Sequence, residues 1–334
     1  MSLKLRYHDG FWPNVLALGY VVAAYVGGFA LLFTGSWLAF VPGVLLLGHA
    51  MAIAAYLIHE CTHNTVFAEQ SANARLGGFL AWLTGACYGA YADVRLKHVR
   101  HHVDRADVVS FDYRKFLREH PGLRRLAEVL EWLYIPAVDI LMHAFVVGAP
   151  FTNPWYRKRR GLVVASLVIR GSLLAALLWW MPMAFLGYLL AYMMFITVMR
   201  LMDMHQHTFD VFVSQEADTK PPVRPSHDFE QRNTFSNILG HGRFVNLLVL
   251  NFGYHNAHHD KPNTPWYRLP SLHRELYGED DSQCLPFRNV LRSYHRYRVK
   301  RVMSEETGDV PIGTGADKGM EFVGVYGVSF LTAL

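Results

Sequence analysis

Four stretches of the chain are apolar and nearly free of charge over the length that a helix needs to cross a bilayer, which is about 20 residues. They are residues 13–34, 38–58, 161–180 and 184–202. The first two carry no charged side chain, and the second two carry one each, Arg170 and Arg200. This pattern predicts an all-α integral membrane protein with four transmembrane helices.

The connections between these stretches predict two helical hairpins. Residues 35–37 join the first pair and residues 181–183 the second, and neither connection carries a charge. Lysine and arginine gather at the other end of the hairpins, with nine of them between residues 93 and 125 and four in a row at 157–160. Because positive residues stay on the cytoplasmic side, we expect both termini and the long loops in the cytoplasm.

Two shorter apolar stretches, 77–92 and 133–150, would place the basic loops on opposite sides of the membrane if only one of them crossed it. We therefore expect interfacial helices there. Residues 210–233 are polar and contain prolines, which predicts a loop. We expect one membrane domain over residues 1–301 and a Gly-rich tail over 302–334, whose apolar end is too short to span a bilayer.

The composition narrows the class of protein. Hydrophobic residues make up 52% of the chain and charged residues 18%, against about 25% charged in a typical soluble domain. A disordered chain and a coiled coil are excluded, because both need more charge or polarity. Three cysteines are too few for a disulfide scaffold, which indicates chemistry that faces a reducing compartment.

Histidine is the outlier, with 18 copies, and eight of them form three clusters. The clusters are His59 and His63; His98, His101 and His102; and His255, His258 and His259. Side chains three or four residues apart lie on one face of a helix, so each cluster can aim its imidazoles at one point. The expected topology places all eight on the cytoplasmic side, near the bilayer.

Eight convergent imidazoles are too many for one zinc ion, which takes about four ligands. They suit two metal ions of higher coordination number, and imidazole binds iron, copper, nickel and zinc. Two redox metals beside a bilayer indicate activation of dioxygen for attack on a lipid chain. An unactivated methylene offers no acidic proton, so the metal centre must supply the oxidising power.

The set HxxxH, HxxHH and HxxHH, with four spans in two hairpins, resembles the membrane-bound fatty acid desaturase and hydroxylase superfamily. Residues 254–260 are similar to bacterial members, and residues 206–208 to a segment of acyl-lipid desaturases. The resemblance implies that the histidines bind two iron ions, which use O2 and two electrons to introduce a double bond into a fatty acyl lipid. It also implies a further ligand after the fourth span, which we assign to His207, with His205 and His241 as alternates.

Four carboxylates lie close in sequence to these histidines and could hold the ligating imidazoles in place. They are Glu60, Asp104, Asp203 and Asp260. No fused electron donor is visible, so the resemblance implies a separate ferredoxin or cytochrome b5-like protein. The basic face would suit an acidic donor, an acyl carrier protein or membrane lipid, although the positive-inside rule alone accounts for it. We expect no nucleic-acid partner and a location in the bacterial inner membrane.

Other readings of the clusters remain. A hydroxylase, ketolase or acetylenase on the same di-iron scaffold would share the first step, the removal of a hydrogen. His59, Glu60 and His63 also match the motif of a zinc protease, with Glu60 as general base, but a protease leaves the other six clustered histidines unexplained. A metal transporter would place its ligands near the membrane midplane, whereas these clusters lie at helix ends and in loops.

Overall fold

The computed structural model describes residues 4–326 apart from 210, 211, 216–220, 222, 241 and 243. The described chain divides into two compact units. The first unit comprises residues up to 93 and 146–198, and the second comprises 94–145 and 199 onward. The expectation of a single domain up to residue 301 stays a prediction.

Four helices of the described chain are long and apolar enough to cross a membrane. They are α1 (Phe11–Phe33), α2 (Trp37–Thr62), α8 (Arg160–Trp180) and α9 (Pro182–Asp203), and the last of these ends in the second unit. They match the four apolar stretches of the sequence to within a few residues. The prediction of an all-α membrane protein with two consecutive helix pairs is confirmed.

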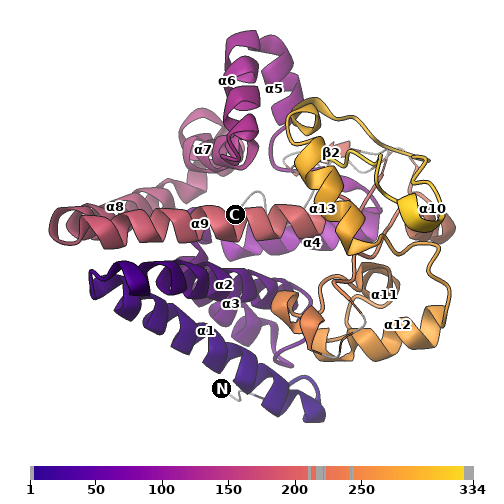
Figure 1. Ribbon diagram of the computed structural model, residues 1–334, viewed down its shortest axis with the longest axis horizontal. Helices are drawn as coiled ribbons and strands as arrows, with labels where there is room; N and C mark the ends of the chain where they lie inside the picture. The colour runs from indigo at the N-terminus through magenta and orange to yellow at the C-terminus, as the bar shows by residue number, and fades with distance from the viewer. Residues whose placement is uncertain are drawn as a thin grey trace. The chain divides into compact units, whose positions relative to one another are not determined.

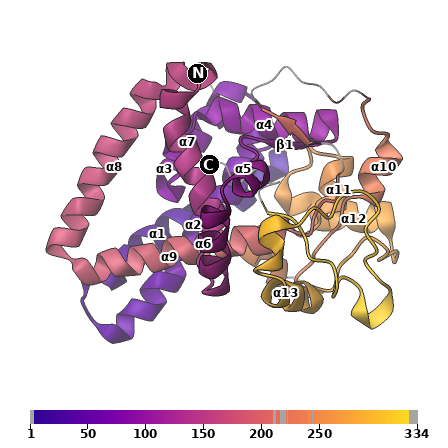
Figure 2. The ribbon, with the colours of Figure 1, turned by 90° about the horizontal axis from the view of Figure 1, so that it is seen from above.

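The two pairs differ in how closely their helices pack. An added Cβ on Gly28 of α1 would lie 2.9 Å from the Cβ of Leu47 on α2, so only a glycine allows this approach. The two pairs also approach each other closely, since an added Cβ on Gly48 of α2 would lie 2.8 Å from the carbonyl oxygen of Ala191 on α9. Small residues at such crossings are typical of membrane helices. By contrast, α8 and α9 diverge from their junction as an open V (Figure 2).

Arg170, inside a predicted span, is paired within the first unit. Its guanidinium donates to the backbone carbonyl of Trp82 and to the hydroxyl of Tyr188, both at 2.6 Å. Trp82 lies near the end of α3 (Gln70–Thr84), where helix carbonyls lack intrahelical partners. The arginine therefore links α8 to the end of α3 and to α9, because a partly buried cation in a membrane protein must find acceptors.

Neither of the two shorter apolar stretches is a candidate span in the described chain, as expected. Residues 77–92 form the end of α3, the 3-10 turn η2 (Ala86–Tyr88) and the start of α4 (Tyr91–Asp104). Residues 133–150 lie mostly in α7 (Ala137–Thr152), which is apolar but short.

The second unit is built from short helices (Figure 1). Besides α4 these are α5 (Tyr113–Glu119), α6 (Pro121–Trp132), α10 (His227–Arg232), α11 (His255–Asp260), α12 (Leu269–Tyr277) and α13 (Phe287–Arg296). The remaining 3-10 turns of the chain are η1 (His8–Gly10), η3 (Pro154–Arg159), η4 (Val245–Val249), η5 (Trp266–Arg268), η6 (Lys300–Met303) and η7 (Gly315–Asp317).

The prediction of a loop over residues 210–233 is wrong in part. Residues Phe212–Ser214 form β2, which pairs in parallel with β1 (Asp107–Val109), and residues His227–Arg232 form α10. The hydroxyl of Ser226 caps α10 by accepting from the amide of Phe229 at 3.1 Å. The strand depends on a partner about a hundred residues earlier in the sequence, which local polarity cannot reveal.

A buried ion-pair network and a hydrophobic cluster form the core of the second unit. The guanidinium of Arg200 lies 2.9 Å from the carboxylate of Glu131 and 2.8 Å from that of Asp139, and all three side chains are buried. The hydrophobic cluster includes Phe322 and Tyr326 near the C-terminus. The last described residues therefore pack into the same core as the helices.

Candidate metal centre

Two helices of the second unit supply six of the clustered histidines. His98, His101 and His102 lie on α4, and the third cluster makes up half of α11. The i, i+3 and i, i+4 spacing turns one face of each helix toward the other. All six side chains are buried, with at most 9% of each residue exposed.

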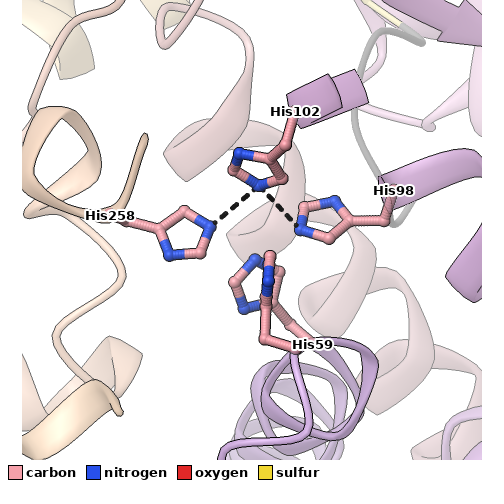
Figure 3. Close-up of side chains that lie close together, drawn as sticks. His59, His98, His102 and His258 are labelled. Carbon is pink, nitrogen blue, oxygen red and sulfur yellow. Dashed lines mark hydrogen bonds between the residues drawn. The ribbon is translucent and has the colours of Figure 1, made fainter. Parts of the chain in front are cut away.

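The first histidine group consists of His98, His102 and His258. The Nε2 atom of His102 lies 3.1 Å from the Nε2 of His98 and 3.1 Å from the Nε2 of His258, and Figure 3 shows the ring of His102 between the other two. Nitrogen ligands that share a metal at about 2.1 Å are themselves about 3.0 to 3.4 Å apart for right-angled or tetrahedral geometry. The three nitrogens are therefore spaced like neighbouring ligands of one ion.

The second histidine group consists of His101, His207, His255 and His259. The Nε2 of His207 lies 3.1 Å from the Nε2 of His101 and 2.7 Å from that of His255. Ring nitrogens of His101, His207 and His259 all lie within 4.8 Å of one another. His101, His207 and His259 therefore have the spacing for a second ion, and His255 lies beside His207.

The Nδ1 atoms of three histidines in the second group lie near acceptors. The Nδ1 of His101 lies 2.9 Å from the carbonyl oxygen of Ala106, and the Nδ1 of His259 lies 3.1 Å from a carboxylate oxygen of Glu230. The Nδ1 of His207 lies 3.4 Å from the hydroxyl oxygen of Thr234. An imidazole that donates through Nδ1 keeps the lone pair of Nε2 for a metal.

The electrostatics of the second group favour neutral imidazoles. Burial lowers the pKa of His207 and of His259 well below 6.5, and the neighbouring histidines lower the pKa of each further. Within the described chain, the Nε2 of His259 is buried and has no hydrogen-bond partner. A neutral, buried nitrogen of this kind fits a transition metal, and the nitrogen-rich ligand set fits iron, copper, nickel or zinc better than calcium or magnesium.

His59 and His63 lie in the first unit, at the C-terminal end of α2. Their ring centroids are 4.8 Å apart, as the i, i+4 spacing predicts. The Nδ1 of His59 lies 3.7 Å from a carboxylate oxygen of Glu60, and the hydroxyl of Thr65 donates to the other oxygen at 2.6 Å. The pair offers two imidazoles from one helix end, with a carboxylate beside them.

A family model described as fatty acid desaturase matches residues 35–290 of the chain. The chain belongs to the fatty acid desaturase family. No curated protein matches the chain significantly. The family match covers all three histidine clusters. A zinc protease would use only His59 and His63 and would leave the other six histidines without a role. As a member of this family the protein is of an enzymatic, oxidoreductase type, and its histidine groups are spaced to bind metal.

The structure distinguishes His207 from His205. His207 lies in the second group, whereas the Nε2 of His205 lies 3.0 Å from the hydroxyl of Ser293 and 3.0 Å from the carbonyl oxygen of Phe322. Because α9 ends at Asp203, His207 is not on the same helix as this candidate carboxylate, and the hydroxyl of Thr234 lies next to the His207 Nδ1. The other alternate, His241, lies outside the described residues.

Two carboxylates that the sequence analysis missed lie near clustered histidines of the second unit. Asp107 of β1 lies 4.0 Å from the Nδ1 of His101, and Glu230 of α10 lies closer to His259. Glu230 accepts from His259 and forms an ion pair with Arg105 at 2.7 Å. Glu230 and His259 are 29 positions apart, so no local spacing could indicate the contact. The structure pairs Asp104 with Arg100 at 2.9 Å and Asp260 with His227 at 3.3 Å, and it places Asp203 near Lys97.

Proposed function

We propose that this family member is a membrane fatty acyl desaturase with a histidine-ligated di-iron centre. The observation that carries the proposal is the convergence of Nε2 atoms in two separate groups of the second unit, in a chain of the fatty acid desaturase family. Two groups of imidazoles at ligand spacing suit two metal ions.

In this proposal the first group would hold one iron and the second group the other, and His59 and His63 of α2 would add two ligands. Bound iron would supply the oxidising power by which O2 and two electrons remove two hydrogens from an acyl chain. The protein's own residues hold the imidazoles in place. Ala106, Thr234 and Glu230 accept from Nδ1 atoms of the second group, which fixes the ring orientation of three ligands.

The apolar helices would hold the acyl substrate in the membrane. A separate electron donor, a ferredoxin or a cytochrome b5-like protein, would dock from the cytoplasm. The basic loops between the spans support a cytoplasmic face for the histidine clusters. The similarity of residues 254–260 to bacterial members supports a bacterial inner-membrane location.

Lipid mass spectrometry tests the reaction. Cells that express the protein should contain acyl chains lighter by two hydrogens than those of cells without it, and the His101→Ala variant should abolish the product. The His120→Ala variant is the matched control, since this histidine is exposed and outside both groups. Products heavier by one oxygen would replace the desaturase with a hydroxylase on the same scaffold.

Elemental analysis tests the metal. Gently purified protein should contain about two irons per chain, as two groups of imidazole ligands imply. One tightly held zinc, with activity that survives iron depletion, would contradict the di-iron proposal. Zinc in overexpressed protein alone would carry less weight, because zinc binds such ligands more tightly than ferrous iron.

A further inference from the structure

The C-terminal segment 320–326 packs against the residues that lead to His207. The amide of Val325 donates to the carbonyl oxygen of Met204 at 2.9 Å, in a backbone contact that joins the segment to the end of α9. The ring of His205 reaches the carbonyl oxygen of Phe322 at 3.0 Å. Residues 322–326 and His205 are all buried.

Arg301 links the C-terminal segment to α13 through hydrogen bonds. This arginine is fully buried, and its guanidinium donates to the carbonyl oxygen of Val323 and, at 3.0 Å, to that of Ser293 on α13. The carboxylate of Glu306 accepts from the amide of Gly324 at 2.9 Å. A buried guanidinium requires acceptors for its donors, so Arg301 holds these carbonyl groups in place.

Gly324 makes the close approach to α9 possible. Its φ is +76°, in the left-handed region that favours glycine. An added Cβ would lie 2.4 Å from the carbonyl oxygen of Met204 and 3.1 Å from the ring of His205. Any side chain at position 324 must therefore displace the backbone just after α9.

The residues from Met204 to His207 have no helix to set their conformation, because α9 ends at Asp203. On one side they are held by residues 233–235, through the amide of Phe235 on the carbonyl of Gln206 at 2.8 Å and a bridge between His207 and Thr234. On the other side they are held by the C-terminal segment.

We propose that the C-terminal segment 320–326 is a positioning element for the second histidine group, and that it holds the backbone that carries His207. The inference rests on the proposed function, because it takes His207 as a ligand. The segment lies beyond the family match, which ends at residue 290, so it is a feature of this chain that the family assignment does not supply.

The Gly324→Ala variant tests this role by metal titration of the purified, metal-free protein with Co²⁺, followed by absorption and by elemental analysis. Wild type should bind two ions. In the variant, the affinity for one ion should fall about 10- to 100-fold, the range for loss of a partner that orients a ligand, while the other ion stays bound. Gly315→Ala is the control, since Gly315 also has a positive φ (+59°) but would meet nothing within 4 Å.

Two outcomes overturn the proposal. One is that Gly324→Ala binds both ions with wild-type affinity. The other is that it loses both ions together, with a fall in the thermal midpoint of the metal-free protein, because that would mean general support of the fold.

A Met204→Cys/Val325→Cys pair separates this inference from the proposed function. Under oxidation these cysteines should cross-link in metal-free protein, which tests the contact without any metal. Absence of the cross-link would overturn the inference. If the cross-link forms but wild type never binds two ions, the proposed di-iron function has failed, and the positioning role falls with it although the contact stands.

Discussion

The two histidine groups of the second unit are built in different ways. The first group takes all three of its members from α4 and α11, so helical spacing and one helix–helix contact suffice to assemble it. The second group adds His207 from a non-helical segment, and three of its Nδ1 atoms depend on Ala106, Thr234 and Glu230. The first group therefore needs helical periodicity and one contact between helices that are distant in the sequence, whereas the second needs several such contacts.

The His207→Ala variant should break the second group most severely. It removes the imidazole whose Nε2 lies 3.1 Å from that of His101 and 2.7 Å from that of His255. The loss of affinity for one metal ion should exceed the about 10- to 100-fold that loss of an outer partner costs, and activity should fall as far as in His101→Ala. Metal titration and product analysis measure both. If one ion is not lost selectively, the division into two groups is incorrect.

The Glu230→Gln variant should weaken the second group by a smaller amount. The amide can still accept from His259, but it loses the charge that strengthens this hydrogen bond and the ion pair with Arg105. We expect affinity for one ion to fall about 10- to 100-fold. Asp104→Asn is the matched control, because the structure pairs Asp104 with Arg100 instead. A larger effect from Asp104→Asn would show that the wrong carboxylate has been chosen.

Acid should destabilise the metal-free protein through the second group. The pKa of His207 and of His259 is lowered in the folded state, so below about pH 6.5 the unfolded chain binds more protons than the folded one. The contribution of these two histidines to the free energy of unfolding is therefore fully present above about pH 6.5. It declines as pH falls, by up to about 1.4 kcal/mol per pH unit for each histidine.

The thermal midpoint of metal-free protein, measured from about pH 7.5 to about pH 5, checks this expectation. The His207→Phe variant should show a shallower decline, since it removes one of the two groups. A midpoint that stays constant over this range would contradict the neutral, buried state of these imidazoles.

The Thr234→Val variant should have the smallest effect. It removes the hydroxyl that lies 3.4 Å from the Nδ1 of His207, a long contact whose loss should cost about 1 kcal/mol. Affinity for one ion should fall about five-fold, which calorimetry of metal binding can resolve. Thr314→Val, at an exposed threonine, is the control. An effect as large as that of Glu230→Gln would mean that Thr234 orients the ring more strongly than the distance indicates.

The sequence by itself determined the membrane class and the histidine clusters. Four apolar stretches of about 20 residues, with at most one charged side chain each, suffice to predict the spanning helices, because every backbone group in a bilayer must be satisfied within a helix. The i, i+3 and i, i+4 spacing likewise predicts which imidazoles share a face. Both signals are local, and for that reason the bounds of α1, α2, α8 and α9 could be anticipated to within a few residues.

Only the tertiary structure decided what lies around the second group. His205 lies against Ser293 and Phe322 whereas His207 lies against His101 and His255. The pairing of Glu230 with His259 joins positions 29 apart. The contact of Gly324 with Met204 joins positions still further apart. Such contacts have no period in the sequence, because they arise from the packing of separate segments into one core, and that packing selects one partner among many of similar chemistry.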